Sequence, residues 1–255
     1  MGKEESKMKR IMLTVAYDGT RYHGWQIQPG VETIEGKLNQ ALSELLKEEI
    51  TVIGASRTDT GVHALGNLAV FDTDTRIPSE KIAYALNQRL PEDIRIQNSK
   101  EVEKEFHPRK ISTRKTYCYS IVSQEFANPL ERLYSHFTYL NLDIDKMRKA
   151  AIFLQGEHDF ASFCAAGSQA ESTVRRIYKI LVTKEENKIK IFVTGNGFLY
   201  NMVRIIAGTL IEVGRGKISP EKMKEIIEAR DRTKAGPTAP ANGLLLVKYE
   251  LEEVL

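Results

Sequence analysis

The stretch Gly54-Ala55-Ser56-Arg57-Thr58-Asp59-Thr60-Gly61-Val62-His63-Ala64 determines how the rest of the chain is interpreted. It places an arginine, a carboxylate, a histidine and two glycines between two apolar, largely β-branched runs at residues 50–53 and 68–71. Such runs are typical of strands, so we expect a loop held between two strands. The glycines allow positive φ or close approach by a ligand, and small neighbours leave Asp59 unobstructed. The pattern predicts an active-site loop; the alternative is an exposed Arg57–Asp59 pair on a connecting turn, which would contribute little to stability.

Length and composition are those of a globular enzyme. The chain has 255 residues and a net charge of +3, enough for one large domain or two small ones. No apolar run approaches the ~20 residues of a membrane span, and the charged residues 1–10 lack a signal core, so we expect a cytoplasmic protein. Residues 1–6 fit a short myristoylation pattern, but a solvated tail is the preferred interpretation. Cys118 and Cys164 give neither a disulfide framework nor metal-ligand spacing, and both are expected to be reduced.

Positive charge is concentrated in residues 107–119. This segment contains no acid, and its basic side chains alternate with Tyr117 and Tyr119. Basic groups bind phosphates and aromatic rings stack on bases, so the segment suits an unpaired nucleotide in RNA. The alternative is a solvated strand with extended lysines. Its four basic residues are Arg109, Lys110, Arg114 and Lys115.

The first half of the chain alternates strand and helix patterns. Residues 9–17 alternate polar and apolar side chains and predict a strand. Residues 20–30 are rich in polar and aromatic side chains, including Trp25, and are a candidate nucleic-acid surface. Thr33 is predicted to cap a helix with apolar positions at 3.6-residue spacing. A helix from Ser79 to about Arg89, a short strand at Ile94 and Ile96, and a charged loop at residues 100–105 complete this half.

The second half repeats this style of organisation. Strands are expected at residues 116–122, 174–183, 188–194 and 244–251, with a hairpin turn at residues 185–187. Helices are expected after Asp143 or Asp145, over residues 200–213, and from the Ser219-Pro220-Glu221 start to about Arg230.

These patterns predict an α+β fold with mainly antiparallel sheets flanked by helices, because no long βαβ series occurs. We expect two subdomains, residues 1–105 with the Asp59 loop and residues 106–255, with a cleft between them.

Residues 56–64 closely resemble the G-R-T-D-A-G-V-H-A signature of the TruA family of tRNA pseudouridine synthases, with departures at Ser56 and Thr60. Further segments are similar to the family in the same order, over nearly the whole chain. They are residues 16–20, 24–26, 114–119 (R-K-T-Y-C-Y), 197–204 (G-F-L-Y-N-M-V-R) and 239–244 (A-P-A-N-G-L). The resemblance implies the pseudouridine synthase fold, with two related subdomains joined by a continuous sheet and the active site in a central basic RNA-binding cleft.

The resemblance also implies roles for individual residues. Asp59 would be the catalytic nucleophile, acting on the ribose, on the base, or through a glycal. Arg204 would pair with the catalytic aspartate and favour its charged form. Arg57 would help displace the target base, Tyr117 would stack on the flipped uracil, and Leu244 would close the other side of the base. Arg109, Lys110 and Arg114 are the residues that we expect to bind tRNA phosphates.

The expected reaction is isomerisation of uridine to pseudouridine at positions 38, 39 and 40 of the tRNA anticodon stem-loop, by a homodimer. This chemistry needs no metal, nucleotide or redox cofactor, and the sequence offers no motif for one. The five histidines lack zinc-like spacing, and His63 is expected to be a structural hydrogen-bonding partner. Two alternatives stay open at this point. A non-catalytic RNA-binding protein would not need Asp59, and a carboxylate-dependent nucleoside hydrolase would release free base.

Overall fold

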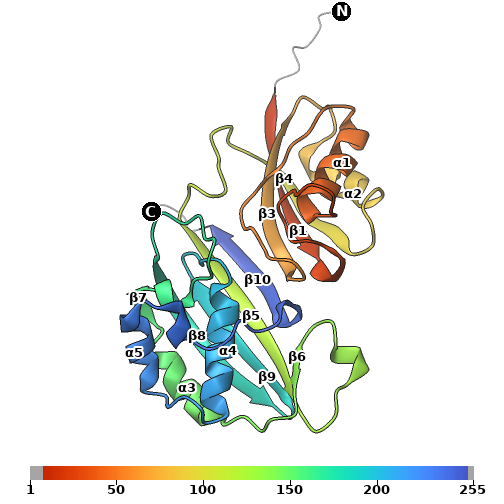
Figure 1. Cartoon of the computed structure of the whole chain (residues 1–255). Helices are drawn as coiled ribbons and strands as arrows, with labels where there is room; N and C mark the ends of the chain where they lie inside the picture. The colour runs from red at the N-terminus through yellow and green to blue at the C-terminus, as the bar shows by residue number, and fades with distance from the viewer. Residues whose placement is uncertain (1–7, 252–255) are drawn as a thin grey trace, which may run out of the picture. The chain divides into compact units, whose positions relative to one another are not determined.

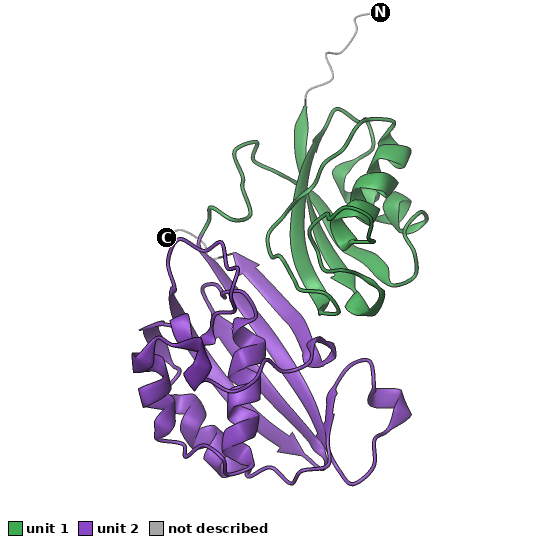
Figure 2. Cartoon of the chain, in the orientation of Figure 1, with its two compact units in different colours: residues 1–111 green, residues 112–255 purple. Residues whose placement is uncertain are grey.

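The computed structural model describes residues 8–251 and has the predicted α+β class, with mainly antiparallel sheet flanked by helices (Figure 1). The tail expected at residues 1–6 lies outside the described residues. The chain forms two compact units, Met1–Ile111 and Ser112–Leu255 (Figure 2). The subdomain boundary expected after residue 105 stays a prediction.

Unit 1 is built on an antiparallel sheet. Its central strand β1 (Lys9–Tyr17) pairs with β3 (His63–Thr73) on one side and with β4 (Ile94–Val102) on the other. The two-residue strand β2 (Ile53–Gly54) also pairs with β3. The strand predicted at residues 9–17 is therefore confirmed, and Ile11, Leu13 and Val15 are fully buried on it.

Helix α1 (Ile34–Leu46) begins where the sequence predicts. The Thr33 hydroxyl accepts a hydrogen bond from the Gly36 amide at 3.2 Å, which satisfies one of the free donors of the first turn. The buried side of α1 is the predicted apolar stripe, and α1 lies beside α2 (Ile82–Asn87) in Figure 1. The residues of the stripe that are buried are Ile34, Leu38, Ala41 and Leu42.

The strand predicted at residues 50–53 is wrong, because only Ile53 joins the sheet there. The preceding amides donate to side chains of α1 instead: Ile50 N to Ser43 Oγ and Val52 N to Asn39 Oδ1, both at 2.9 Å. These residues are β-branched, but their backbone donors are satisfied without a partner strand.

Three other expectations in unit 1 are corrected. Trp25 is fully buried, so it is core rather than nucleic-acid surface. Ser79 does not cap a helix; residues Ser79–Lys81 form a 3₁₀ turn that leads into α2. Strand β4 continues to Val102, into the segment expected to be a loop.

Unit 2 has a larger sheet in the order β10, β5, β9, β8, β7, with antiparallel neighbours throughout. The four predicted strands are confirmed as β5 (Thr113–Ser123), β8 (Val174–Glu185), β9 (Lys188–Gly195) and β10 (Leu244–Leu251). Two short strands were not predicted: β6 (His136–Thr138), which is parallel to β5, and β7 (Gly156–Asp159). The helices, all on one face of this sheet in Figure 1, are α3 (Ile144–Ile152), α4 (Met202–Gly214) and α5 (Lys222–Ala229).

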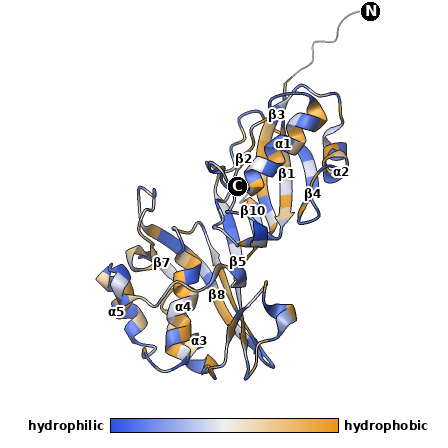
Figure 3. Cartoon of the chain, turned by 45° about the vertical axis from the view of Figure 1, so that its right-hand side comes forward, coloured by the Kyte–Doolittle hydropathy of each residue, from blue (hydrophilic) through white to orange (hydrophobic). Residues whose placement is uncertain are grey.

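Helix α4 is the most buried helix of unit 2 and appears largely hydrophobic in Figure 3. Residues 236–239 run along it: the Ala239 amide donates to the Arg204 carbonyl at 3.1 Å, and the Gly236 amide donates to Thr209 Oγ1 at 2.9 Å. A Cβ on Gly208 would lie 1.8 Å from the Pro237 carbonyl oxygen. Only glycine at position 208 permits this contact, which fixes the helix that carries Arg204.

Replacing Gly208 by alanine should therefore destabilise the protein by about 2–3 kcal/mol, because the backbone clash outweighs the better helix propensity of alanine. The measurement is urea unfolding followed by circular dichroism. Gly66→Ala is the control. A Cβ at position 66 would lie 3.5 Å from the Thr14 methyl carbon, which is an ordinary contact and not a clash. Equal stability of the two variants would contradict the proposed packing of α4.

Candidate active site

The segment between β2 and β3, residues 55–62, is a tightly hydrogen-bonded turn that we call the Asp59 loop. The Ala55 amide donates to the Leu68 carbonyl at 2.8 Å, and the Trp25 amide donates to the Thr58 carbonyl at 3.0 Å. Within the loop, the Val62 amide donates to the Asp59 carbonyl at 3.1 Å. Backbone bonds to two other segments hold the loop, which argues against a simple connecting turn.

Asn67 on β3 supplies the central side-chain contact of the Asp59 loop. Its Oδ1 accepts from the Ser56 amide at 3.2 Å, and its Nδ2 donates to the Ser56 carbonyl at 2.9 Å. The Tyr17 hydroxyl lies 2.7 Å from Thr58 Oγ1. Burial raises the pKa of Tyr17, so its hydroxyl remains protonated in this contact. Asn67 is fully buried, and Tyr17 is buried as well.

Gly54, just before the Asp59 loop, and Gly61, within it, have different physical roles. A Cβ on Gly54 would lie 2.2 Å from Trp25 Nε1, so this glycine allows the indole ring to pack against the backbone. Gly61 has a φ of +78°, a conformation that glycine adopts at low cost. Both features that the sequence suggested, close approach and positive φ, are present, and Trp25 rather than a ligand makes the close approach.

The loop presents its charged residues unequally. Arg57 is exposed and Asp59 is half-buried, while Ser56 and Thr58 are buried on either side of Arg57. The alternation buries the small side chains and leaves Arg57 exposed and Asp59 partly exposed.

His63, at the start of β3, has the structural role that the sequence predicts. Its Nδ1 accepts a hydrogen bond from the Gly19 amide at 3.1 Å. The same nitrogen lies 3.1 Å from Asp18 Oδ1, but an atom that accepts from an amide cannot also donate to a carboxylate. Asp18 Oδ1 instead accepts from the Thr20 amide at 3.0 Å and the Thr20 hydroxyl at 2.6 Å. His63 therefore joins the Asp59 loop to the turn that follows β1.

In unit 2, Tyr117 lies on β5, opposite Val193 of β9 and Leu246 of β10. Its ring meets that of Phe198 edge-on, with centroids 5.3 Å apart and planes at 90°. This geometry is favourable for aromatic pairs and fixes the ring of Tyr117. Only 8% of Tyr117 is exposed, so one small part of the residue is open to solvent.

Arg204 is held at the first turn of α4. Its Nε donates to the Ala239 carbonyl and its Nη1 donates to Asn201 Oδ1, both at 2.8 Å. Asn201 has a left-handed backbone, with a φ of 59°, and its side chain binds Arg204 rather than capping the helix. Two bonds to one guanidinium fix both its position and its plane.

Leu244 begins β10, opposite Tyr119 of β5, and is buried. The Tyr119 hydroxyl donates to the Pro240 carbonyl at 2.8 Å, just before Leu244 in the chain. Burial raises the pKa of Tyr119, and the nearby positive charge of Arg204 opposes this shift. Tyr119, Arg204 and the segment that precedes Leu244 are thus neighbours within unit 2.

The predicted basic segment has several structural environments. Arg109 Nε donates to the Gly54 carbonyl at 2.6 Å, and Lys110 is exposed. On β5, the guanidinium of Arg114 lies over the ring of Tyr178, 4.5 Å from its centroid. Lys115 lies over the Tyr249 ring in the same way, at 5.0 Å. The aromatic partners of these two cations therefore come from other strands of the sheet: Tyr178 lies on β8 and Tyr249 on β10.

The structure thus places Arg57 and Asp59 together on one loop of unit 1. Arg204, the start of β10 and the tyrosines of β5 are positioned within unit 2. Sequence reasoning missed Asn67 and Phe198, although each left a signal. Asn67 is a lone amide in an apolar strand, and Phe198 belongs to the G-F-L-Y segment. A buried amide in a strand needs hydrogen-bond partners, and this predicts a nearby backbone segment to bind.

Within residues 8–251, no group of three or more His, Cys, Asp or Glu side chains is arranged to hold a metal ion. Among the helices described, none is long and apolar enough to cross a membrane.

Comparison with known proteins identifies the family. The family model described as tRNA pseudouridine synthase matches residues 13–109 and 150–250, more than half of the chain. The chain is 52% identical to the tRNA pseudouridine synthase A of Ruminiclostridium cellulolyticum, over 94% of this chain and 99% of that protein. It is 49% identical to the tRNA pseudouridine synthase A of a Thermoanaerobacter species, with the same shares covered.

A solved structure, the archaeal box H/ACA sRNP Nop10-Cbf5 complex, is 12% identical over 88% of this chain and 60% of its own chain. Its TM-score of 0.36 is too low to support an argument. The match to the family model and the identity to full-length relatives are sufficient: this chain belongs to the tRNA pseudouridine synthase family of isomerases.

Proposed function

We propose that this chain isomerises uridine to pseudouridine at positions 38, 39 and 40 of the tRNA anticodon stem-loop, with Asp59 as the nucleophile and the target base flipped out. The observation that carries the proposal is the Asp59 loop, a half-buried carboxylate on a backbone fixed by Asn67, in a chain of this family.

A carboxylate suits the reaction because pseudouridine formation breaks a glycosidic bond and rejoins the uracil through carbon 5. Carboxylates act as nucleophiles at glycosidic carbons in glycosidases. A nucleophile must also be held close to the productive geometry, and the hydrogen bonds to Ala55, Ser56 and Thr58 hold the backbone on which Asp59 lies. Attack on the ribose, attack on the base and a glycal intermediate are all compatible with this arrangement.

Arg57 is two residues from Asp59 and exposed, so its planar guanidinium can occupy the space that a flipped base vacates. Flipping costs a few kcal/mol, and a cation that replaces the lost stacking reduces this cost.

In unit 2, we assign Tyr117 to stacking on the flipped uracil and Leu244 to the other side of the base. Phe198 packs against the Tyr117 ring with the two ring planes at 90°, and this contact holds the ring in place. Arg204 is assigned to the catalytic machinery, because its guanidinium is fixed by two hydrogen bonds at the start of a buried helix.

Arg109, Lys110 and Arg114 are assigned to tRNA phosphates. Arg114 keeps its charge while lying over the ring of Tyr178, so the cation and the aromatic ring form one surface of the kind that binds nucleic acid. We further propose that the enzyme acts in the cytoplasm and as a homodimer, in which two copies double the basic surface of a chain with a net charge of only +3.

Replacing Asp59 by asparagine should abolish turnover while folding and tRNA binding are retained, because the side chain keeps its size and loses its charge. The assay is tritium release from tRNA labelled at uracil carbon 5, with binding measured by filter retention. Substantial release by the folded variant would refute the nucleophile. Free uracil among the wild-type products would instead indicate a hydrolase.

Replacing Tyr117 by phenylalanine tests whether the hydroxyl takes part in proton transfer. We expect normal tRNA binding and turnover at least tenfold slower, since a positioned proton-transfer group contributes about 10²–10⁴ in rate. Tyr117→Leu should also lose stacking, worth roughly 1–3 kcal/mol per base. If the phenylalanine variant turns over normally, Tyr117 acts only through stacking or through its packing on Phe198.

Removing Arg109, Lys110 or Arg114 should weaken tRNA binding and flatten its salt dependence, each lost phosphate contact changing the logarithmic slope by about 0.7–0.9. Lys224→Gln, on the exposed side of α5, is the matched control for loss of one positive charge. The measurement is affinity between 50 and 200 mM salt, approximately the range over which such contacts are sensitive. Unchanged affinity and slope in all three variants would place the RNA elsewhere.

A further inference from the structure

We propose that Asp93 is a positioning residue for the Asp59 loop, through the turn of residues 18–22 that follows β1. The inference rests on the proposed role of Asp59 and adds a residue that does not itself touch the RNA. Asp93 lies just before β4, far in sequence from the loop that it would position.

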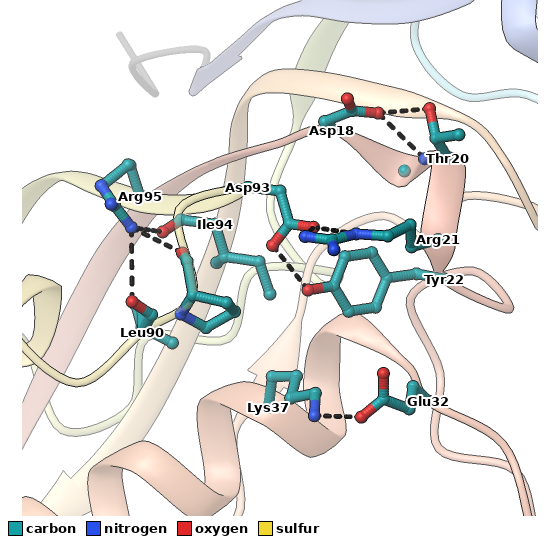
Figure 4. A network of polar contacts seen from close by, with 12 residues as sticks. Asp18, Thr20, Arg21, Tyr22, Glu32, Lys37, Leu90, Asp93, Ile94 and Arg95 are labelled. Atoms are coloured by element: carbon teal, nitrogen blue, oxygen red, sulfur yellow. Dashed lines mark hydrogen bonds and ion pairs between the residues drawn. The ribbon is translucent and has the colours of Figure 1, made fainter. Parts of the chain in front are cut away.

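Asp93 binds the turn at residues 18–22 with both carboxylate oxygens, as Figure 4 shows, and also with its backbone carbonyl. Oδ2 accepts from Arg21 Nε at 3.0 Å and from Arg21 Nη2 at 2.6 Å, while Oδ1 accepts from the Tyr22 hydroxyl at 2.7 Å. The Asp93 carbonyl accepts from the Asp18 amide at 2.9 Å. One residue thus binds the beginning and the end of the turn.

The position of Asp93 is itself fixed by the neighbouring backbone. The Ile94 amide donates to the Pro91 carbonyl at 3.1 Å, which closes the turn before β4. Arg95 Nη1 donates to the Pro91 carbonyl at 2.5 Å. It also donates to the Ile94 carbonyl at 2.7 Å, and Figure 4 shows Arg95 beside Ile94. Asp93 is therefore a rigid anchor, because the carbonyls around it are bound by Arg95.

The turn at residues 18–22 contacts the Asp59 loop at two places and the first residue of β3, His63, at a third. The Gly61 amide donates to the Tyr22 carbonyl at 3.3 Å, and the Gly19 amide donates to His63 Nδ1 at 3.1 Å. A Cβ on Gly19 would lie 2.0 Å from the Val62 carbonyl oxygen, so the two backbones are in direct contact. A shift of this turn would therefore move the residues directly after Asp59.

Burial strengthens the bond of Asp93 to Tyr22, whereas its partner Arg21 is 67% exposed. The Asp93 side chain is only 9% exposed, and Tyr22 is buried. Burial and the adjacent Asp93 carboxylate raise the pKa of Tyr22, so its hydroxyl stays a donor to Asp93. The side-chain oxygen of asparagine at position 93 could still accept from the Tyr22 hydroxyl. Its NH₂ group would then face Arg21, and two groups that only donate cannot form a hydrogen bond. The turn would keep one side-chain bond where it now has three, and small displacements of catalytic groups reduce rates strongly.

The experiment compares Asp93→Asn with Asp72→Asn. Asp72 is the matched control, because it also binds an arginine with two bonds in unit 1: Arg10 Nε and Nη2 donate to its two oxygens, each at 2.7 Å. That pair lies at the opposite end of β1 from Asp18. Each variant removes a carboxylate that binds an arginine with two hydrogen bonds. If turnover fell only because the protein was less stable, both variants would therefore lose turnover.

For Asp93→Asn we expect turnover at saturating tRNA to fall at least tenfold, with KM within about twofold of wild type. Hydrogen exchange of the peptide covering residues 57–63 should accelerate, while exchange in β1 is unchanged. Asp72→Asn should keep turnover within twofold. Tyr22→Phe removes only the hydroxyl bond to Asp93 and should lower turnover in the same direction, so it decides the question if Asp93→Asn does not fold.

Turnover of folded Asp93→Asn within twofold of wild type, or equal losses in the two aspartate variants, would overturn the inference. Its failure is distinguishable from failure of the proposed function. If the proposed function is wrong, the wild-type protein forms no pseudouridine in tRNA or Asp59→Asn stays active, and neither result depends on the Asp93 variants.

Discussion

The arrangement of unit 1 depends on the paired hydrogen bonds between the Asn67 amide and the backbone of Ser56. Beyond Gly54 the Ala55 amide still binds β3, but the amide and carbonyl of the next residue, Ser56, need a partner that no strand supplies. The fully buried side chain of Asn67 has both a donor and an acceptor. It therefore supplies Ser56 with the two hydrogen bonds that a neighbouring strand would otherwise form. The loop can then turn away from the sheet and present Arg57 and Asp59 without becoming mobile.

Unit 2 uses the same principle on a different element. Residues 236–239 follow α4 so closely that Gly208 has no room for a side chain, and the Ala239 carbonyl then receives Arg204 Nε. In unit 1 the side chain of Asn67 fixes the backbone beside Arg57 and Asp59, and in unit 2 the backbone carbonyl of Ala239 binds Arg204 directly. Arginine suits this arrangement, since its planar fork can form several hydrogen bonds at once.

Sequence patterns were sufficient where a local signal determines the structure. The periodicity of β1, the capping threonine of α1 and the hairpin of β8 and β9 were all predicted, because each depends on neighbouring residues. Residues 50–52 were mispredicted because their amides bind side chains of α1, and β-propensity does not reveal which acceptor an amide will use. For the same reason Asp59 and Arg57 were proposed as site residues from one short motif, whereas the contacts of Asn67, Phe198 and Asp93 were not predicted. Their importance lies in contacts with residues distant in sequence.

The departure of Ser56 from the family signature has a physical explanation in these contacts. Asn67 binds only the backbone of residue 56, so the side chain at this position is not needed to hold the loop. The Ser56 hydroxyl is buried and, among the described residues, has no hydrogen-bond partner. A buried hydroxyl without a partner reduces stability by about 1–3 kcal/mol, so glycine at position 56 would remove this cost. Glycine also gives the unfolded chain more conformational freedom, and this lowers stability and offsets part of the gain. The loop can therefore carry serine or glycine at position 56 and keep the same backbone, because the constraint on its geometry comes from position 67.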